Sequence, residues 1–272
     1  MAMVEVRGLE KHFVRRAAPW GRPTRVTAVD GFDLSIEEGE IVGLIGESGS
    51  GKTTAGRCLL RLVEPSAGSF AFRGEDVFAM SPARLRQARR QMQMVFQDPE
   101  SSLDPRMRAG AIVEEGLVIH GLGTPAERRG RVREMLELVG LDANRADRYP
   151  HEFSGGERQR LGLARALALA PSFLVADEPV SSLDLSIQAQ IVNLFMDLQQ
   201  QLGLTLLFIT HDLRLVRHLC SRVVVMHRGR TVGAGPAADV DRLWGQISTG
   251  EPAGSDLEFR SPPGRRAAEF EV

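Results

Sequence analysis

Short apolar runs alternate along the chain with longer segments in which apolar residues recur every three or four positions. The runs at 41–45, 173–176 and 205–209 are almost entirely apolar, which is typical of strands buried on both faces of a sheet. Segments with helical spacing lie at 55–62, 154–170 and 187–202. This alternation of strand and helix predicts an α/β domain with a doubly wound sheet.

The N-terminal part departs from this alternation. Residues 3–9 and 33–36 have the pattern of strands. The segment from Arg15 to Arg25, rich in Arg, Pro and Gly, predicts an exposed loop between them.

The middle of the chain also departs from it. From about residue 107 to residue 148 the pattern is helical, and one helix begins cleanly at Thr124-Pro125 and ends at Gly140. We interpret this block as a helical subdomain inserted in the core. From about Thr249 onward Gly, Pro, Ser and charged residues dominate, so we expect a largely disordered tail.

One loop carries the strongest chemical signal. It joins the strand at 41–45 to the following helix and has the sequence Gly46-Glu47-Ser48-Gly49-Ser50-Gly51-Lys52-Thr53-Thr54. A phosphate-binding loop requires this strand–loop–helix context. Its glycines let backbone N–H groups approach phosphate oxygens, and the helix N-terminus adds its positive dipole end. Lys52 supplies a cation for the outer phosphates, and Thr53 offers a hydroxyl to Mg²⁺.

Lysine is rare in this chain, which strengthens the signal. Lys11 and Lys52 are the only lysines among 34 Lys and Arg residues. A lysine in the loop therefore indicates a need for a compact point charge rather than a planar guanidinium.

Acidic and polar side chains follow other strands of the predicted sheet. Ligands bind at the C-terminal ends of strands in a doubly wound sheet, and Asp177, Glu178, Gln97 and His211 all follow strands. Asp177 suits a carboxylate that supports Mg²⁺, and Glu178 is placed to orient or deprotonate an attacking water. The alternative for this acidic pair is that it caps the next helix.

Three further residues are weaker signals when each is taken alone. Gln97 could polarise the attacking water or contact the metal, although glutamine is common at strand ends. His211 could hydrogen-bond the γ-phosphate of a nucleotide or have a structural role. Phe13 could stack on an adenine ring or be an ordinary core or edge residue.

The segment Ser154-Gly155-Gly156-Glu157 opens the helix at 154–170. Ser154 and Glu157 form a capping box. The two glycines remove side chains from the first turn and expose its N–H groups, which makes a second anion site. Because the phosphate loop already has one helix N-terminus, this second one suggests that the γ-phosphate is held from a second molecule.

The bulk composition narrows the classes of protein. A chain of 272 residues with 43% hydrophobic and 25% charged residues is ordinary for a soluble globular domain. A formal net charge of −1 gives no indication of nucleic-acid binding. Cys58 and Cys220 lack metal-binding spacing, which favours a reduced, cytosolic protein. The sequence has no run of eighteen apolar residues, so we expect membrane contact only through a partner.

Together these motifs resemble those of the ATP-binding subunit of an ABC transporter, over about residues 4 to 236. The matching stretches are Walker A at 46–54, the Q-loop at Gln97, the signature at 154–159, Walker B at 173–178, the D-loop at 181–184 and the switch histidine His211. The resemblance implies a P-loop NTPase fold with an N-terminal antiparallel β subdomain and an inserted α-helical subdomain at about 98–165. The domain would span 1–240, with the tail at 241–272.

The resemblance also implies how the protein works. Two such subunits close head to tail over two ATP molecules, so that Ser154, Gly155 and Gly156 contact the nucleotide held by the second ATP-binding subunit. Asp184 of the D-loop adds a nucleotide contact, and Phe13 aligns with the adenine-stacking aromatic. The loop after Gln97 and the helical subdomain dock integral membrane permease subunits at the cytoplasmic face of the membrane. A solute-binding protein would deliver cargo to an importer.

Within the family, the chain is similar to the dipeptide and oligopeptide importer branch at 94–99, 102–107 and 176–190. The His-Pro-Tyr-Thr-like element of that branch does not follow Pro236, which leaves importers of nickel or other small solutes open. A soluble, non-transport ABC ATPase is a further alternative, but the chain has no sustained heptads and one cassette only. A small-molecule kinase would not explain Ser154 to Glu157 or His211.

Overall fold

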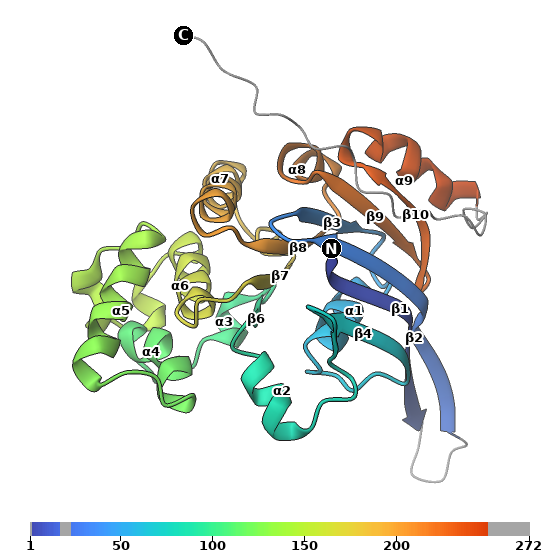
Figure 1. The fold of residues 1–272 in the computed structure, drawn as a ribbon. Coiled ribbons are helices and arrows are strands. Elements are labelled where there is room, and N and C mark those ends of the chain that lie inside the picture. Colours follow the sequence, from blue (N-terminus) through green and yellow to red (C-terminus); the bar gives the residue numbers. More distant parts are fainter. Residues whose placement is uncertain (1, 17–22, 250–272) are drawn as a thin grey trace.

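The computed structural model describes residues 2–16 and 23–249, which form two β-sheets and several layers of helices (Figure 1). The predicted α/β class is confirmed, with an antiparallel sheet beside a mostly parallel one. Among the described residues, no helix is both long enough and apolar enough to cross a bilayer.

The larger sheet positions the functional loops. Its strand order is β10-β9-β3-β8-β7-β6, and neighbouring strands run parallel except for β9 and β10. Its strands are β3 (Ile41–Ile45), β6 (Met92–Val95), β7 (Phe173–Asp177), β8 (Thr205–Thr210), β9 (Arg222–His227) and β10 (Arg230–Pro236). Parallel strands end at one edge, so the loops after β3, β6, β7 and β8 meet there.

The smaller sheet is antiparallel, in the order β2-β1-β4-β5. Its strands are β1 (Ala2–Arg16), β2 (Pro23–Glu37), β4 (Ala67–Phe72) and β5 (Glu75–Asp76). The expected loop from Arg15 to Arg25 is wrong at both ends, because β1 and β2 pair as far as Arg16 and Pro23. Val14 and Val26, in the outer arms of this hairpin, are exposed. These arms therefore lack the alternation of apolar and polar residues that marks a half-buried strand. Residues 17–22 of the expected loop lie outside the described residues.

Helices cover the larger sheet and form a separate group at one side (Figure 1). The helical elements are α1 (Lys52–Leu59), α2 (Pro82–Ala88), α3 (Pro99–Ser102), α4 (Ala109–Ile119), α5 (Pro125–Leu138), η1 (Ala143–Asp147), η2 (Pro150–Glu152), α6 (Gly155–Leu167), α7 (Leu185–Leu202), α8 (Leu213–Leu219), η3 (Ala237–Asp239) and α9 (Val240–Thr249). Every element from α3 to α6 is helical, which is the region where the sequence indicates an inserted subdomain.

Helix α9 occupies the first part of the predicted tail segment at 241–272 and ends at Thr249, the residue from about which we expect disorder. Val240 and Leu243 are buried, and Asp241 pairs with Arg217 of α8. The apolar residues Val240, Leu243, Trp244 and Ile247 recur with helical spacing, but they follow a Gly-Pro pair, which is a local signal for the end of regular structure. The rest of the expected tail, residues 250–272, lies outside the described residues.

Both faces of the larger sheet are buried. Along β7, Leu174 and Ala176 pack in the core shared with α6, α7 and α8, whereas Phe173 and Val175 pack in the core between the two sheets. Successive side chains of a strand point to opposite faces, so a strand between two cores must be apolar at every position. This explains the continuous apolar runs in the sequence.

A buried ion pair connects the two sheets. Nε of Arg222, at the start of β9, donates to Oε1 of Glu40 at 2.9 Å, and its guanidinium also donates to the carbonyl of Ser35 in β2. The side chains of Arg222 and Glu40 are only 8% and 11% exposed. Each charge is therefore paired with the other, and the Glu40 carboxylate also accepts from the backbone N–H of Glu37 at 2.9 Å.

We expect Arg222→Met to lower the free energy of unfolding by about 3 kcal/mol, because it leaves the Glu40 carboxylate buried without its cation. Urea unfolding followed by circular dichroism measures the change. Arg84→Met is the control, since it breaks an exposed pair with Glu75 and should cost less than about 1 kcal/mol. An equal decrease in the free energy of unfolding for the two variants would contradict a larger contribution from the buried pair.

Candidate nucleotide-binding site

The phosphate loop is shaped by close backbone contacts that only glycine allows. Gly51 caps α1 in the left-handed region, with φ of 105°. A Cβ atom at Gly51 would lie 2.2 Å from the carbonyl oxygen of Ala28, and one at Gly46 would lie 2.1 Å from that of Met226. Because Gly46 and Gly51 have no side chains, the loop can lie directly against β2 and β9.

Lys52 lies inside this loop. Its Nζ donates to the carbonyls of Gly46 at 2.8 Å and Glu47 at 2.9 Å, and the residue is 4% exposed. Burial lowers the pKa of the ammonium, and the nearby carboxylates of Glu178 and Asp177 oppose that shift. The loop thus holds a positive charge at its centre, as the sequence predicts for a phosphate site.

Asp177, at the end of β7, is fully buried next to the start of α1. The Thr53 hydroxyl donates to its Oδ1 at 2.9 Å. Burial raises the pKa of the Asp177 carboxyl, and the Thr53 hydrogen bond opposes the shift. Its Oδ2 has no hydrogen-bond partner among the described residues. A buried carboxylate oxygen without a partner, beside a threonine hydroxyl, is a donor set that suits Mg²⁺.

Glu178 meets two other predicted residues at the same edge. Its Oε2 lies 3.3 Å from Nε2 of Gln97 and 3.3 Å from Nδ1 of His211. Glu178 has a φ of 44°, and its backbone N–H donates to the carbonyl of Ile209 at 2.9 Å. This left-handed backbone costs of the order of 1–3 kcal/mol, and such strain is concentrated at functional sites. Residues that follow β6, β7 and β8 thus form one cluster.

These groups line one pocket with a volume of about 580 Å³. Its lining consists of Ala28, Glu47, Ser48, Gly49, Gly51, Lys52, Thr53, Thr54, Gln97, Glu178, His211 and Trp244. Asp177 and Ser50 are buried behind it. The pocket combines backbone N–H groups, a cation and a carboxylate, which is the chemistry needed to bind a phosphate chain and cleave it.

The other predicted site residues do not line this pocket. Phe13 is 42% exposed on the β1–β2 hairpin, with Nζ of Lys11 4.9 Å from its ring centroid. Ser154, Gly155 and Gly156 lie at the start of α6, and Asp184 lies at the start of α7. A single chain therefore brings the phosphate loop, Gln97, Asp177, Glu178 and His211 together, but not the signature or the D-loop.

The start of α6 has the predicted capping box. The backbone N–H of Ser154 donates to Oε2 of Glu157 at 2.8 Å, and the Ser154 hydroxyl accepts from the backbone of Glu157. A hydrogen bond from Arg145 and one from that Ser154 N–H lower the pKa of Glu157 to about 2. A Cβ atom at Gly156 would lie 2.6 Å from Cγ2 of Ile187, so this glycine also permits the close packing of α6 on α7.

Two residues of the pocket were not anticipated from the sequence. Trp244 falls in the predicted tail segment, and its spacing from Val240 and Leu243 is a sequence signal for the helix that carries it. Ala28 lies at the pocket because its backbone carbonyl closely approaches Gly51. Its side chain carries no chemical group that could indicate this role in the sequence.

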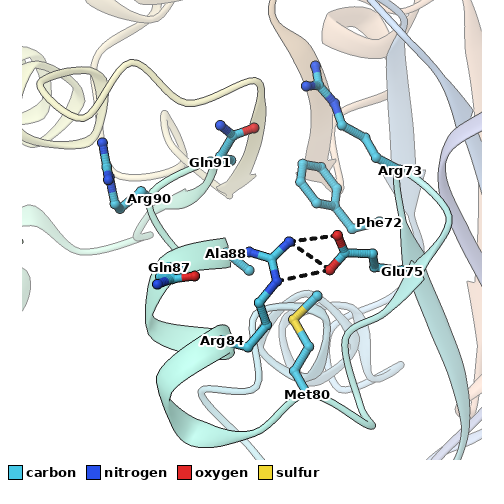
Figure 2. Close-up of a pocket in the computed structure, with 9 residues that line it drawn as sticks. All are labelled: Phe72, Arg73, Glu75, Met80, Arg84, Gln87, Ala88, Arg90 and Gln91. Carbon is cyan, nitrogen blue, oxygen red and sulfur yellow. Dashed lines mark hydrogen bonds and ion pairs between the residues drawn. The ribbon is translucent and has the colours of Figure 1, made fainter.

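A second hollow lies between α2 and the β4–β5 turn, with a volume of about 370 Å³ (Figure 2). Phe72 and Met80 line it, and Arg84 pairs with Glu75 across it at 2.7 Å. It contains none of the predicted site residues. The chemistry expected from the sequence therefore belongs to the pocket at the phosphate loop.

Comparison with known proteins agrees with this geometry. The family model described as "ABC transporter" matches residues 29–181, which is more than half of the chain and includes the phosphate loop, Gln97 and Glu178. A Brucella ovis protein provisionally named as a peptide import ATP-binding protein is 54% identical over 88% of this chain and 73% of its own length. The oligopeptide transport ATP-binding protein OppF of Bacillus subtilis is 50% identical over 88% of this chain and 77% of its own length.

Solved structures agree as well. The cassette MJ0796, in a dimeric post-hydrolysis state bound to ADP and Pi, has a TM-score of 0.76 and 29% identity, covering 86% of this chain and 99% of that one. CbiO1 of Clostridium perfringens, part of the ABC transporter complex CbiONQ, has a TM-score of 0.74 and 28% identity, covering 89% and 91%. The chain therefore belongs to the ABC transporter family, as one of its ATP-binding proteins.

Proposed function

We propose that this chain is the ATP-hydrolysing subunit of a peptide importer and acts at the cytoplasmic face of the cell membrane. The observation that carries the proposal is the meeting of Lys52, Thr53, Asp177 and Glu178 at one edge of the sheet. The names of its relatives describe peptide import and oligopeptide transport, which supports peptides over nickel or another small solute as the cargo.

In this proposal the phosphate loop binds the triphosphate of ATP. Lys52 exchanges its contacts with loop carbonyls for the outer phosphates, to which its buried charge is strongly attracted. The first N–H groups of α1 have no partners within the helix and donate to the same oxygens.

Thr53 and Asp177 are the residues that would hold Mg²⁺, with Gln97 as a further oxygen ligand. Asp177 would use Oδ2, the buried oxygen without a partner among the described residues, directly or through water. When bound, the ion would neutralise charge on the β- and γ-phosphates.

Glu178 orients the attacking water and accepts its proton. Its side chain reaches both Gln97 and His211, which hold the carboxylate at the edge of the pocket. His211 then hydrogen-bonds the γ-phosphate on the same side. Proton acceptance by a positioned carboxylate contributes typically 10²–10⁴-fold to a rate.

The remaining nucleotide contacts come from a second ATP-binding subunit. Ser154, Gly155, Gly156 and Asp184 lie outside the pocket of their own chain, which supports their acting on a partner's ATP. The helix start at Gly155-Gly156 offers N–H groups to a phosphate. The dimeric state of the MJ0796 structure supports the same arrangement.

An exposed apolar surface supports docking of integral membrane permease subunits. Leu62, Val118 and Ile119 are about half exposed. Helix α2 joins the segments that carry them, because Arg86 donates to the carbonyl of Ile119 and Arg89 donates to those of Leu60 and Arg61. A solute-binding protein would deliver peptides to the permease subunits, and no role for nucleic acid is proposed.

We expect Glu178→Gln to bind ATP, to lose turnover by on the order of 10²–10⁴-fold and to accumulate as a closed dimer, because the general base is lost. Phosphate release and size-exclusion chromatography with ATP measure this. Glu134→Gln, on the exposed face of α5, is the control. Near-normal hydrolysis by the Glu178 variant would remove this residue from the proposed role.

We expect Ser154→Arg to reduce hydrolysis at least tenfold while the same chain still binds ATP, because the substitution blocks the partner's phosphate but not its own loop. The two measurements are nucleotide binding, followed by fluorescence, and the turnover rate. Thr124→Arg is the matched control, since it removes the same capping box from α5. If ATP binding and turnover fell together in the Ser154 variant, the two-chain site would be wrong.

We expect Leu62→Asp to leave the ATPase activity of the isolated subunit within about twofold of wild type but to prevent co-purification with the permease subunits, because a charge replaces apolar contact. Leu202→Asp, at a leucine of similar exposure on α7, is the control. Retention of the permease subunits by the Leu62 variant would place the docking surface elsewhere.

A further inference from the structure

We propose that Trp244 is a base-contacting residue, whose indole ring forms one wall of the subsite for the adenine of ATP. The inference rests on the proposed assignment of the pocket to ATP. Trp244 lines the same pocket as the phosphate loop, Glu178 and His211.

The order of the strands determines which end of the nucleotide Trp244 would meet. Gln97, Glu178 and His211 follow β6, β7 and β8, which lie on one side of β3. Helix α9 packs on β9 and β10, on the other side of β3. Because β3 carries the phosphate loop, the γ-phosphate points toward Glu178, and the nucleoside extends toward β9 and α9.

The second wall of this subsite comes from the β1–β2 hairpin. Ala28 of β2 lines the pocket, and its carbonyl oxygen is in tight contact with Gly51. Two residues earlier, Val26 pairs with Phe13 across the hairpin. The hairpin that carries the predicted adenine-stacking Phe13 therefore reaches the pocket at Ala28, and α9 brings Trp244 to the same pocket.

The packing of α9 holds the indole in place. Trp244 is partly buried and packs against the core cluster, while Val240 and Leu243 anchor the helix from its buried face. The ion pair between Asp241 and Arg217 ties α9 to α8. A tryptophan restrained in this way offers a flat apolar surface at little cost in side-chain entropy, and aromatic side chains stack on any base.

Substitution of Trp244 by alanine distinguishes contact with the base from a role in supporting the phosphate loop. We expect Trp244→Ala to raise the KM for ATP about five- to tenfold with kcat within about twofold, as loss of one base-stacking contact implies. The Ki of magnesium tripolyphosphate, a competitor without a base, should stay unchanged. Trp244→Phe should keep the KM within about twofold of wild type.

Fluorescence gives a second measurement that needs no change at Trp244. The chain has two tryptophans, and Trp20 lies outside the described residues. In a Trp20→Phe variant the emission comes from Trp244 alone. ATP should quench or shift this emission, and magnesium tripolyphosphate should do so much less.

Equal weakening of ATP and tripolyphosphate in Trp244→Ala would overturn the inference, because it would show support of the loop rather than base contact. An unchanged KM, or emission from Trp20→Phe that does not respond to ATP, would overturn it too. Lys52→Ala tests the underlying assignment separately, since it should lose both ATP and tripolyphosphate. Normal hydrolysis by that variant would instead contradict the proposed function.

Discussion

The contact on which the site depends is the one between the buried Lys52 ammonium and the carbonyls of its own loop. Burying a charge is costly unless it is paired or hydrogen-bonded. Two carbonyls at 2.8 and 2.9 Å meet that requirement and fix the ammonium beside the start of α1. The loop can follow this path because Gly46 and Gly51 have no side chains where other backbone segments approach. Cation, helix N-terminus and exposed N–H groups are thus assembled in advance at one point.

The sheet extends this local arrangement into a catalytic one. Both of its faces are covered by apolar cores, so its strands are fixed in register and direction. Side chains placed directly after β6, β7 and β8 then converge on the loop after β3 without further support from long loops. The strained backbone of Glu178 belongs to this geometry, because its N–H is tied to the neighbouring strand at Ile209.

The sequence revealed the parts of the fold that local patterns encode. The apolar strands, the glycine-rich loop and the capping box at Ser154 each depend on a few adjacent residues, and the structure contains all three. The full length of the β1–β2 hairpin was missed because its outer arms have no buried face, and α9 was missed because the Gly-Pro pair before it signals the end of regular structure. That Glu178 has a left-handed backbone, and that Trp244 lines the pocket, depend on tertiary packing that no local pattern records.

The two hydrogen bonds from Arg89 to the carbonyls of Leu60 and Arg61 have a mechanical consequence. They lock the C-terminal end of α1 to α2, and α1 is a helix of eight residues, about 12 Å long. The end of α1 opposite the phosphate loop is therefore hydrogen-bonded to the end of α2. In the function we propose, a displacement of α2 by a docked partner would reach the phosphate loop through about two turns of helix.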